Sequence, residues 1–251
     1  MELSKSKESL YSQLGRKKMR DKHSLFMAEG RKSVADTIGY FEPEAIIAVK
    51  GADIPDSWLS ADCFFDVTPE RMAKISTLST PPEVLAVYRI LNSNGKIPPP
   101  KADELYLLLD EVQDPGNLGT IIRTAHWFGI KRIYCSQTTA DLYNPKTVQS
   151  TMGSLGRVDV IYCDLKELIE ANPEMPVYGT LLNGENIYKA PLGNHGFIIM
   201  GNEGRGISEA LRRKVTSPLL IPPYDAKDHS ESLNVAIATA VTLSQFRSHL
   251  S

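Results

Sequence analysis

The stretch that decides the fold reads LYLLLDEVQDPGNLGTIIRTAHWFGIKRIYC, from Leu105 to Cys135. An apolar run ends at Asp110, a Pro-Gly turn follows, and a second apolar run, KRIYC, closes the stretch. Between them, residues 117–128 carry apolar side chains at the i, i+3, i+4, i+7 spacing of a core-facing helix. These side chains are Leu118, Ile121, Ile122 and Ala125. Two apolar strands separated by such a helix predict part of a parallel sheet.

The same alternation continues to the C-terminus. Apolar runs predict further strands at residues 157–162, 176–182, 197–200 and 218–221. Helices are expected between and after them, at residues 144–152, 164–171, 207–214 and 232–249. Strands that are apolar throughout indicate an α/β fold whose parallel sheet is covered on both faces. Ligands bind such sheets beyond the carboxyl ends of the strands, so function is expected in the loops after Asp110, Leu182, Met200 and Ile221.

A smaller α/β unit precedes this sheet. Apolar runs predict strands at residues 45–49, 63–67 and 84–90, and helices are expected at residues 30–41 and 68–78. The second helix opens with Thr68-Pro69-Glu70, a typical helix start. The polar, proline-rich segment NSNGKIPPPKAD, residues 92–103, then interrupts the pattern. We therefore predict an N-terminal domain over residues 1–95, a linker over 96–104 and a second domain over 105–251.

The composition favours a soluble protein of the cytoplasm. Of the 251 residues, 42% are hydrophobic and 23% are charged, which is ordinary for a globular chain. The chain has no apolar run of the roughly 18 to 20 residues that a membrane helix needs and no apolar signal segment at its start. Cys63, Cys135 and Cys163 are odd in number and widely spaced, so they are expected to be core residues of a protein in a reducing compartment.

Charge is distributed unevenly along the chain. The net charge is −2, but residues 1–32 hold nine Lys and Arg against four Asp and Glu, so they carry +5 and the remainder −7. A basic arm on an otherwise acidic chain could contact phosphates. A solvated helix face would explain the same charges equally well.

Two turns that follow buried strands carry candidate functional residues. After the first strand, Asn117 is placed to cap the helix, and Arg123 lies off the buried stripe near the ligand-binding edge, unless it forms an ordinary surface salt bridge. The segment FIIMGNEGRGIS places three glycines around Glu203, and glycines let a backbone approach a ligand closely. The order is GxxGxG rather than the GxGxxG of dinucleotide sites. Glu203 could equally be a structural carboxylate held by backbone N–H groups.

A third segment, PLLIPPYDAKDHSESLNVAIATAVTLSQF, runs from a strand through a double proline into the last helix. That helix opens at Ser232-Leu233-Asn234 and is apolar nearly all round, so it should be buried on every side, and this favours packing against a second subunit. Asn234 is expected either to cap the helix or to have a definite polar partner. His229 has no second ligand at a suitable spacing, so no metal site is expected.

In this order and spacing, the three segments resemble the SpoU (TrmH-like) branch of the SPOUT RNA 2′-O-ribose methyltransferases. DEVQDPGNLGTIIRTAHWFGI resembles the first family motif, IIMGNEGRGIS the second and LLIPPYDAKDHSESLNVAIA the third, and the match spans residues 105–246. The segments RDKHSLFMAEGRKSV and STPPEVLAV resemble the small ribosomal-protein-like RNA-binding domain that often precedes this enzyme. The loop between Pro222 and Ser232 looks longer than the commonest family pattern, which leaves the detailed shape of the donor pocket open.

The resemblance implies a homodimer whose parallel sheet ends in a deep C-terminal trefoil knot, an exception to the rule that chains do not thread loops. It implies S-adenosylmethionine as the methyl donor, held by the backbone of the knotted loops. The matching donor-binding positions are Gly201, Ile221 and Leu233, with Thr180 and Leu182 beside the adenine. The functional polar residues of the family correspond to Asn117, Arg123, Glu203, Ser232 and Asn234.

For such an enzyme we expect in-line displacement by a ribose 2′-hydroxyl, with both reactants held in near-attack geometry. Arg123 would activate the acceptor, either by drawing its proton or by clamping the adjacent phosphate. A guanidinium is an awkward base because its pKa lies above about 12. Glu203 and Asn117 would hold Arg123 and the loops, while Ser232 and Asn234 would shape the site. Ribosomal RNA is the preferred substrate over transfer RNA.

Two other classes of function compete with this interpretation. A non-catalytic RNA-binding or assembly factor could retain the fold, and it would not bind S-adenosylmethionine. A nucleotide-dependent dehydrogenase would also have a doubly wound sheet, but the reversed glycine order argues against it.

Overall fold

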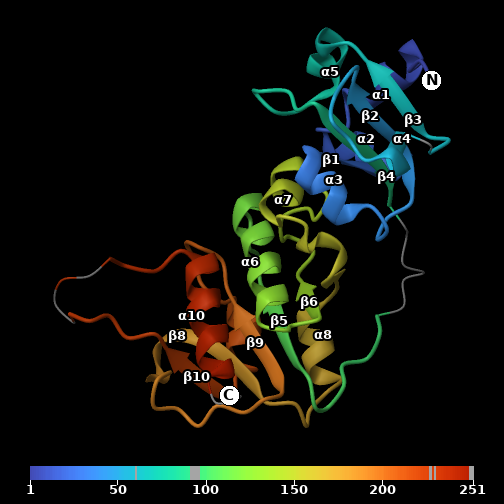
Figure 1. The fold of residues 1–251 in the computed structure, drawn as a ribbon. Coiled ribbons are helices and arrows are strands. Elements are labelled where there is room, and N and C mark those ends of the chain that lie inside the picture. The colour runs from blue at the N-terminus through green and yellow to red at the C-terminus, as the bar shows by residue number, and fades with distance from the viewer. Residues whose placement is uncertain (60, 91–96, 226–227, 229, 249–251) are drawn as a thin grey trace. The chain divides into compact units, whose positions relative to one another are not determined.

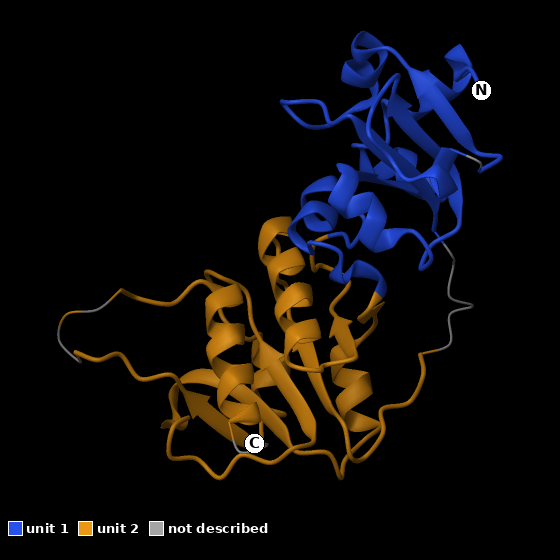
Figure 2. Cartoon of the chain, in the orientation of Figure 1, with its two compact units in different colours: residues 1–95, 141–156 blue, residues 96–140, 157–251 orange. Residues whose placement is uncertain are grey.

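The computed structural model describes residues 1–59, 61–90, 97–225, 228 and 230–248 (Figure 1). The chain forms two compact units, which Figure 2 colours separately. Unit 1 comprises Met1–Gly95 and Asp141–Gly156, and unit 2 comprises Lys96–Ala140 and Arg157–Ser251. Residues 141–156 thus belong to unit 1, although they fall inside the second of the domains expected from the sequence. Within the described residues, no helix has the length and apolar character needed to cross a membrane.

Unit 1 is a small α/β structure, as the sequence predicts. Its sheet has the order β1-β4-β2-β3, with β4 antiparallel to both β1 and β2, and β3 parallel to β2. The strands are β1 (Leu25–Glu29), β2 (Pro43–Val49), β3 (Phe64–Val67) and β4 (Val84–Arg89). The helices are α1 (Lys5–Tyr11), α2 (Lys17–His23), α3 (Arg31–Thr37), α4 (Asp56–Leu59), α5 (Pro69–Ile75) and α7 (Pro145–Ser150), with a 3-10 turn at Ser154–Gly156.

Local sequence explains several of these boundaries. The expected start of α5 is confirmed, because the Thr68 side chain accepts a hydrogen bond from the Arg71 backbone N–H. The predicted helix over residues 30–41 ends at Thr37, and the strands at 45–49, 63–67 and 84–90 are confirmed within two residues. Strand β1 and the two helices before it did not emerge from the sequence pattern.

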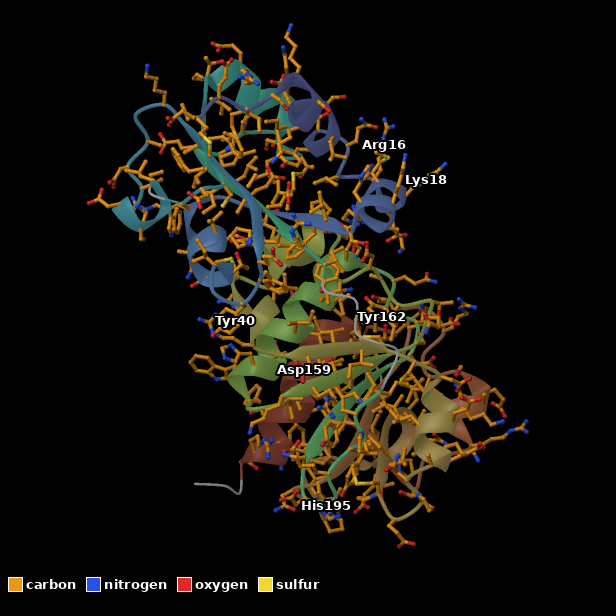
Figure 3. The ribbon with its side chains drawn as sticks, turned by 90° about the vertical axis from the view of Figure 1, so that its right-hand side faces the viewer. Arg16, Lys18, Tyr40, Asp159, Tyr162 and His195 are labelled. Atoms are coloured by element: carbon orange, nitrogen blue, oxygen red, sulfur yellow. The ribbon has the colours of Figure 1, made fainter. Side chains whose placement is uncertain are left out.

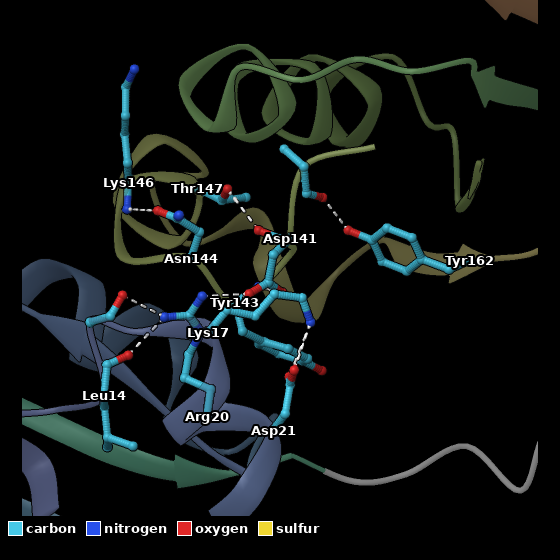
Figure 4. Close-up of polar contacts among 12 residues, drawn as sticks. Leu14, Lys17, Arg20, Asp21, Asp141, Tyr143, Asn144, Lys146, Thr147 and Tyr162 are labelled. Carbon is cyan, nitrogen blue, oxygen red and sulfur yellow. Dashed lines mark hydrogen bonds and ion pairs between the residues drawn. The ribbon is translucent and has the colours of Figure 1, made fainter. Parts of the chain in front are cut away.

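Residues 141–156 join unit 1 through specific contacts with α2 and β1. The Arg20 side chain is only 2% exposed, and its Nη2 lies 2.5 Å from Oδ2 of Asp141 (Figure 4). The rings of Phe26 and Tyr143 stack at 4.6 Å between centroids. These long-range contacts, rather than any local sequence signal, assign the segment to this unit.

Unit 2 contains a six-stranded sheet in the order β10-β8-β9-β5-β6-β7, and every strand pair is parallel. The predicted parallel α/β sheet is therefore confirmed. The strands are β5 (Leu105–Leu109), β6 (Arg132–Cys135), β7 (Asp159–Tyr162), β8 (Val177–Asn186), β9 (Gly196–Met200) and β10 (Ser217–Leu220). The helices are α6 (Pro115–Trp127), α8 (Leu165–Glu170), α9 (Glu209–Arg212) and α10 (Val235–Arg247).

Helices cover both faces of this sheet. On one face, Tyr106, Leu108 and Phe197 share an apolar cluster with residues of α8 and α9. Since successive strand residues point to opposite faces, Tyr178 lies on the other face, where its ring meets that of Phe246 in α10 at 4.8 Å. Helix α6 lies beside α10, and its predicted buried stripe is confirmed, because all four members are fully buried.

Helix α10 differs from the expectation in two ways. It begins at Val235 instead of Ser232, and its expected last residue, 249, lies outside the described part of the chain. Within one chain it is also not buried on every side, because Ile237 is 54% exposed. An apolar side chain, Ile237, is therefore uncovered on the side of the helix that faces away from the sheet. His229 likewise lies outside the described residues.

Candidate functional site

Two loops at the carboxyl edge of the sheet are tied together by a buried carboxylate. Asp110 directly follows β5 and is only 5% exposed. Its Oδ2 accepts a hydrogen bond of 2.7 Å from the backbone N–H of Ser208, in the loop that follows β9. A buried carboxylate needs such a donor, since an unpaired one would be costly to desolvate. The loops after β5 and β9, both expected from the sequence to carry function, are thus held at one edge.

A chain of side-chain hydrogen bonds connects three of the predicted site residues. Nδ2 of Asn234 donates to Oδ1 of Asn117 at 3.0 Å, and Nδ2 of Asn117 donates to Oε1 of Glu203 at 2.9 Å. These residues lie 117 and 86 positions apart in the sequence, so only the fold brings them together. The chain of bonds fixes how all three side chains are oriented. Among the described residues, Glu203 accepts from this side-chain amide and not from backbone N–H groups.

The structure defines the N-terminal caps of α6 and α10, the two helices at the site. The expectation that Asn117 caps α6 is wrong: the cap is Asp114, whose Oδ1 accepts from the Asn117 backbone N–H at 2.9 Å. Asn117 sits one turn inside the helix, which leaves its amide free for the other partners. Asn234 does cap α10, through Oδ1, while its Nδ2 serves Asn117. Both alternatives for Asn234 therefore hold at once.

The loop from Gly201 to Gly206 is shaped by Asn202, which the sequence did not single out. Its Oδ1 accepts from the backbone N–H groups of Gly204 and Arg205, and its Nδ2 donates to the Glu111 carbonyl at 2.9 Å. Arg205 pairs with the Glu111 carboxylate at 3.0 Å. Glu111 itself has a φ of 59°, an uncommon value outside glycine. Asparagine is frequent in tight turns, and this preference is the one sequence signal that could have identified Asn202.

Gly201 is required by a close backbone approach. A Cβ at this position would lie 2.3 Å from the carbonyl carbon of Gly206, so any larger residue would displace the loop. A similar approach occurs between Gly184 and Leu219, where a Cβ would lie 2.4 Å from backbone. The loop after β9 thus packs backbone against backbone on itself, and β8 does so against β10.

The remaining expected donor positions lie along the same edge. Thr180 donates weakly to the Ile199 carbonyl at 3.5 Å, and Ile221 is half-buried directly after β10. Leu182 and Leu233 are 83% and 47% exposed, which is high for leucine. A hollow of about 480 Å³ lies near the first of these. Its lining is Leu181, Leu182, Asn183, Arg212, Val215 and Pro218.

Arg123 and Ser232 do not join the polar chain. Arg123 lies on the exposed side of α6 and makes no hydrogen bond or ion pair with any residue that the structure describes. The alternative of a surface salt bridge is therefore not observed either. Ser232 is exposed, and its carbonyl accepts from the Ser230 hydroxyl at 3.3 Å. Arg123 thus presents an uncompensated positive charge at the surface of α6.

The cysteines and the potential metal ligands are candidates for a second site in the described part of the chain. Cys135 and Cys163 are buried, as expected, and Cys63 is half-buried. Burial raises the pKa of the Cys163 thiol to about 11 and raises the pKa of Cys135 further, so neither is a thiolate at neutral pH. No group of three or more His, Cys, Asp or Glu residues that could hold a metal ion occurs among the described residues.

Comparison with known proteins gives a consistent result. Residues 104–244 match the SpoU rRNA Methylase family, and residues 10–86 match the MRM3-like substrate binding domain. A curated relative is the 23S rRNA (guanosine(2553)-2′-O)-methyltransferase RlmP of Bacillus subtilis, 37% identical over 196 residues, which cover 75% of this chain and 71% of that protein.

Solved structures agree over the whole chain. A TrmH-family protein from Porphyromonas gingivalis is 33% identical, with a TM-score of 0.84 and 99% of each chain covered. An rRNA methyltransferase from Sinorhizobium meliloti with bound AdoMet (S-adenosylmethionine) is 28% identical, with a TM-score of 0.85, and the match covers 100% of this chain and 97% of that one.

Proposed function

The chain belongs to the SpoU rRNA methylase family, and from that premise we propose that it transfers a methyl group from S-adenosylmethionine to a ribose 2′-hydroxyl of ribosomal RNA. The hydrogen-bonded chain from Asn234 through Asn117 to Glu203 carries the proposal. It joins one residue from each of the three segments that resemble the family motifs. The relative RlmP is named for the same reaction on 23S rRNA.

The donor would bind at the carboxyl edge, against the backbone at Gly201, Ile221 and Leu233. Two observations support this fit. The loop after β9 turns tightly at Gly201, where its backbone approaches that of Gly206 with no room for a side chain. Leu182 and Leu233 leave apolar surface uncovered at the same edge, which suits the adenine and the methionine chain of the donor. Thr180 would lie beside the adenine.

We also propose that this region contains the trefoil knot that the family resemblance implies. The backbone contact between Gly184 and Leu219 supports it, because two segments far apart in the sequence pass each other closely there. A register shift between Pro218 and Leu219 marks the same place, where β8 and β10 separate and pair again.

The donor supplies an electrophilic methyl carbon on a sulfonium ion, so the protein has to orient the acceptor and accommodate its proton. The 2′-oxygen forms the new bond to carbon, the carbon–sulfur bond breaks towards sulfur, and the hydroxyl proton leaves to solvent or to a nearby base. Glu203, held by Asn117, keeps acceptor capacity for a further donor. Arg123 has no anionic partner among the described residues, and this favours the phosphate clamp over the base.

A homodimer is also proposed, formed through the outer sides of α6 and α10. On the side of each helix opposite its buried residues, Trp127 is 84% and Ile237 is 54% exposed. Apolar groups of this size exposed on neighbouring helices suit a partner subunit. Arg123 lies on that same side of α6, so it would sit at the interface. In sedimentation, Ile237→Asp should shift a dimer to monomer, and an unchanged dimer would refute this interface.

Two expectations complete the proposal. The transfer would need no metal ion, because the methyl group is already activated in the donor. The enzyme would work in the cytoplasm, on RNA of the large ribosomal subunit.

The decisive experiment has two steps. Calorimetry should detect binding of S-adenosylmethionine to the purified protein, and a protein that does not bind it would be a non-catalytic factor instead. Labelled methyl groups should then be transferred to unmodified 23S rRNA, and mapping of 2′-O-methyl positions should find one defined site. Transfer to tRNA but not to rRNA would replace the proposed substrate.

A further inference from the structure

Helix α2 in unit 1 is held by a cation that points inward. Arg20 is 2% exposed, and its Nη1 donates to the carbonyls of Leu14 and Gly15, both at 2.8 Å. Its Nη2 pairs with Asp141 at 2.5 Å (Figure 4). The charge of Arg20 is thus neutralised inside the unit by Asp141. The helix is fixed by this contact and cannot turn without burying a different side chain.

The other cations of the helix point outward. With about 100° between successive residues, Lys18 and Lys22 lie on the side opposite Arg20, and both are exposed. Arg16 precedes the helix as its N-cap residue and is exposed as well. Figure 3 shows Arg16 and Lys18 extending from the helix into solvent. Within the described residues, none of the three has an ion-pair partner.

Most other cations of unit 1 are neutralised. The paired side chains are Lys7, Lys17, Arg31, Lys32, Arg71 and Arg89, each within 4 Å of a carboxylate. Lys5, Lys50 and Lys74 are exposed and unpaired in the described chain, but Lys5 of α1 and Lys74 of α5 line a hollow that also contains the carboxylates of Glu2 and Glu8, and Lys50 stands alone after β2. Free positive charge is therefore concentrated on α2. Lys18 and Lys22 also repel each other at i, i+4 spacing, a cost that a bound anion would remove.

We propose that Arg16, Lys18 and Lys22 form a phosphate-contacting surface through which unit 1 docks on the RNA substrate. The inference rests on the proposed function, which supplies the polyanion. Contacts to phosphates are independent of sequence and fix position and orientation. A helix locked by Arg20 presents the three charges in a constant arrangement, as such docking requires.

The test compares two variants with the same loss of charge. The first is R16Q/K18Q/K22Q, and the matched control is K5Q/K50Q/K74Q, which removes three exposed lysines elsewhere in the unit. Binding of unmodified, in vitro transcribed Bacillus subtilis 23S rRNA is measured over a series of salt concentrations. We expect the slope of log K against log salt to fall by about two to three for the first variant, since each phosphate contact contributes roughly 0.7 to 0.9. The slope for the control should differ from that of the original protein by less than the contribution of one phosphate contact.

Further readouts separate the possible failures. Thermal unfolding of both variants should match the original protein, because glutamine keeps the helix propensity, and binding of S-adenosylmethionine should not change. Equal slopes for the two variants would overturn the proposal. If the original protein binds RNA through α2 and transfers no methyl group, the proposed function fails while the docking surface stands.

Discussion

Unit 1 buries the guanidinium of Arg20 against the carboxylate of Asp141, whereas unit 2 joins Asn234, Asn117 and Glu203 in a chain with one charged end. In the first arrangement the charges cancel, and four of the five N–H donors of the guanidinium are engaged. In the second, neutral amides orient a carboxylate without neutralising it, and Asn117 and Glu203 are only half-buried. The difference indicates that the ion pair stabilises a structure, while the amide chain keeps an acceptor ready for a ligand.

The largest expected effect comes from breaking the ion pair. Asp141→Ala leaves the buried guanidinium without its counter-charge, and this should cost roughly 3–5 kcal/mol in the free energy of unfolding. The two tryptophans allow the units to be followed separately, because Trp58 lies in unit 1 and Trp127 in unit 2. Urea unfolding monitored by Trp58 in a Trp127→Phe background should show the loss.

Asp53→Ala is the matched control for that measurement. Asp53 pairs with Arg31, but its side chain is 89% exposed, so its removal should cost at most about 1 kcal/mol. Equal losses for the two variants would show that burial does not distinguish these pairs.

The next effect should be seen in activity alone. Arg123→Ala should lower methyl transfer by about 100-fold, because without the phosphate clamp the acceptor ribose is not held in its reactive position. Its affinity for S-adenosylmethionine should not change. Arg213→Ala removes an arginine that is 76% exposed and pairs with Glu209, and it should transfer methyl groups normally. Near-normal turnover of the Arg123 variant would remove the assignment.

A smaller effect is expected from interrupting the amide chain. Asn117→Ala leaves Oε1 of Glu203 and Nδ2 of Asn234 without their shared partner, so the carboxylate loses its fixed orientation. A misplaced group of this kind should lower kcat/KM by about 10- to 100-fold. Asn172→Ala removes a comparable amide, which donates to the Leu168 carbonyl at 2.8 Å away from the site, and it should keep its activity. Similar activity in both variants would argue against a functional chain.

The smallest effect concerns the thiols. Because burial raises the pKa of Cys163 to about 11, iodoacetamide at pH 8 should modify the half-buried Cys63 of unit 1 first. Methyl transfer should be unchanged after that reaction. Modification of Cys163 should accelerate only as the pH rises towards 11, where the thiolate forms. Rapid labelling of Cys163 at pH 8, detected by mass spectrometry, would show that the fold of unit 2 opens around Cys163 and exposes the thiol to the reagent.

Sequence reasoning identified the parallel sheet because its strands are apolar throughout, and this pattern needs no partner to be recognised. It missed the burial of Arg20 because a run of Lys and Arg resembles a solvated surface until its distant partner, Asp141, is known. It placed the α6 cap at Asn117, although Asp114 followed by Pro115 has the same arrangement as Thr68 and Pro69, which was interpreted correctly.

The site was predicted only in part, again because contacts between distant residues cannot be read from one sequence. The family resemblance named Asn117, Glu203 and Asn234 but could not say which atom donates to which. Asn202 was missed because its bonds are to backbone groups, which leave no trace in side-chain patterns. Contacts between distant segments are what one sequence does not reveal.

Unit 1 is not a continuous stretch of chain, and this limits how the protein can be divided. A fragment ending at residue 90 would lack Asp141 and Tyr143, so Arg20 would be left with an unbalanced charge and the Phe26 ring would face water. A chimera that takes its RNA-docking half from a relative must therefore import residues 141–156 along with residues 1–95. Recombination at the proline-rich segment alone would take residues 1–95 and residues 141–156 from different parent proteins, although they form one unit.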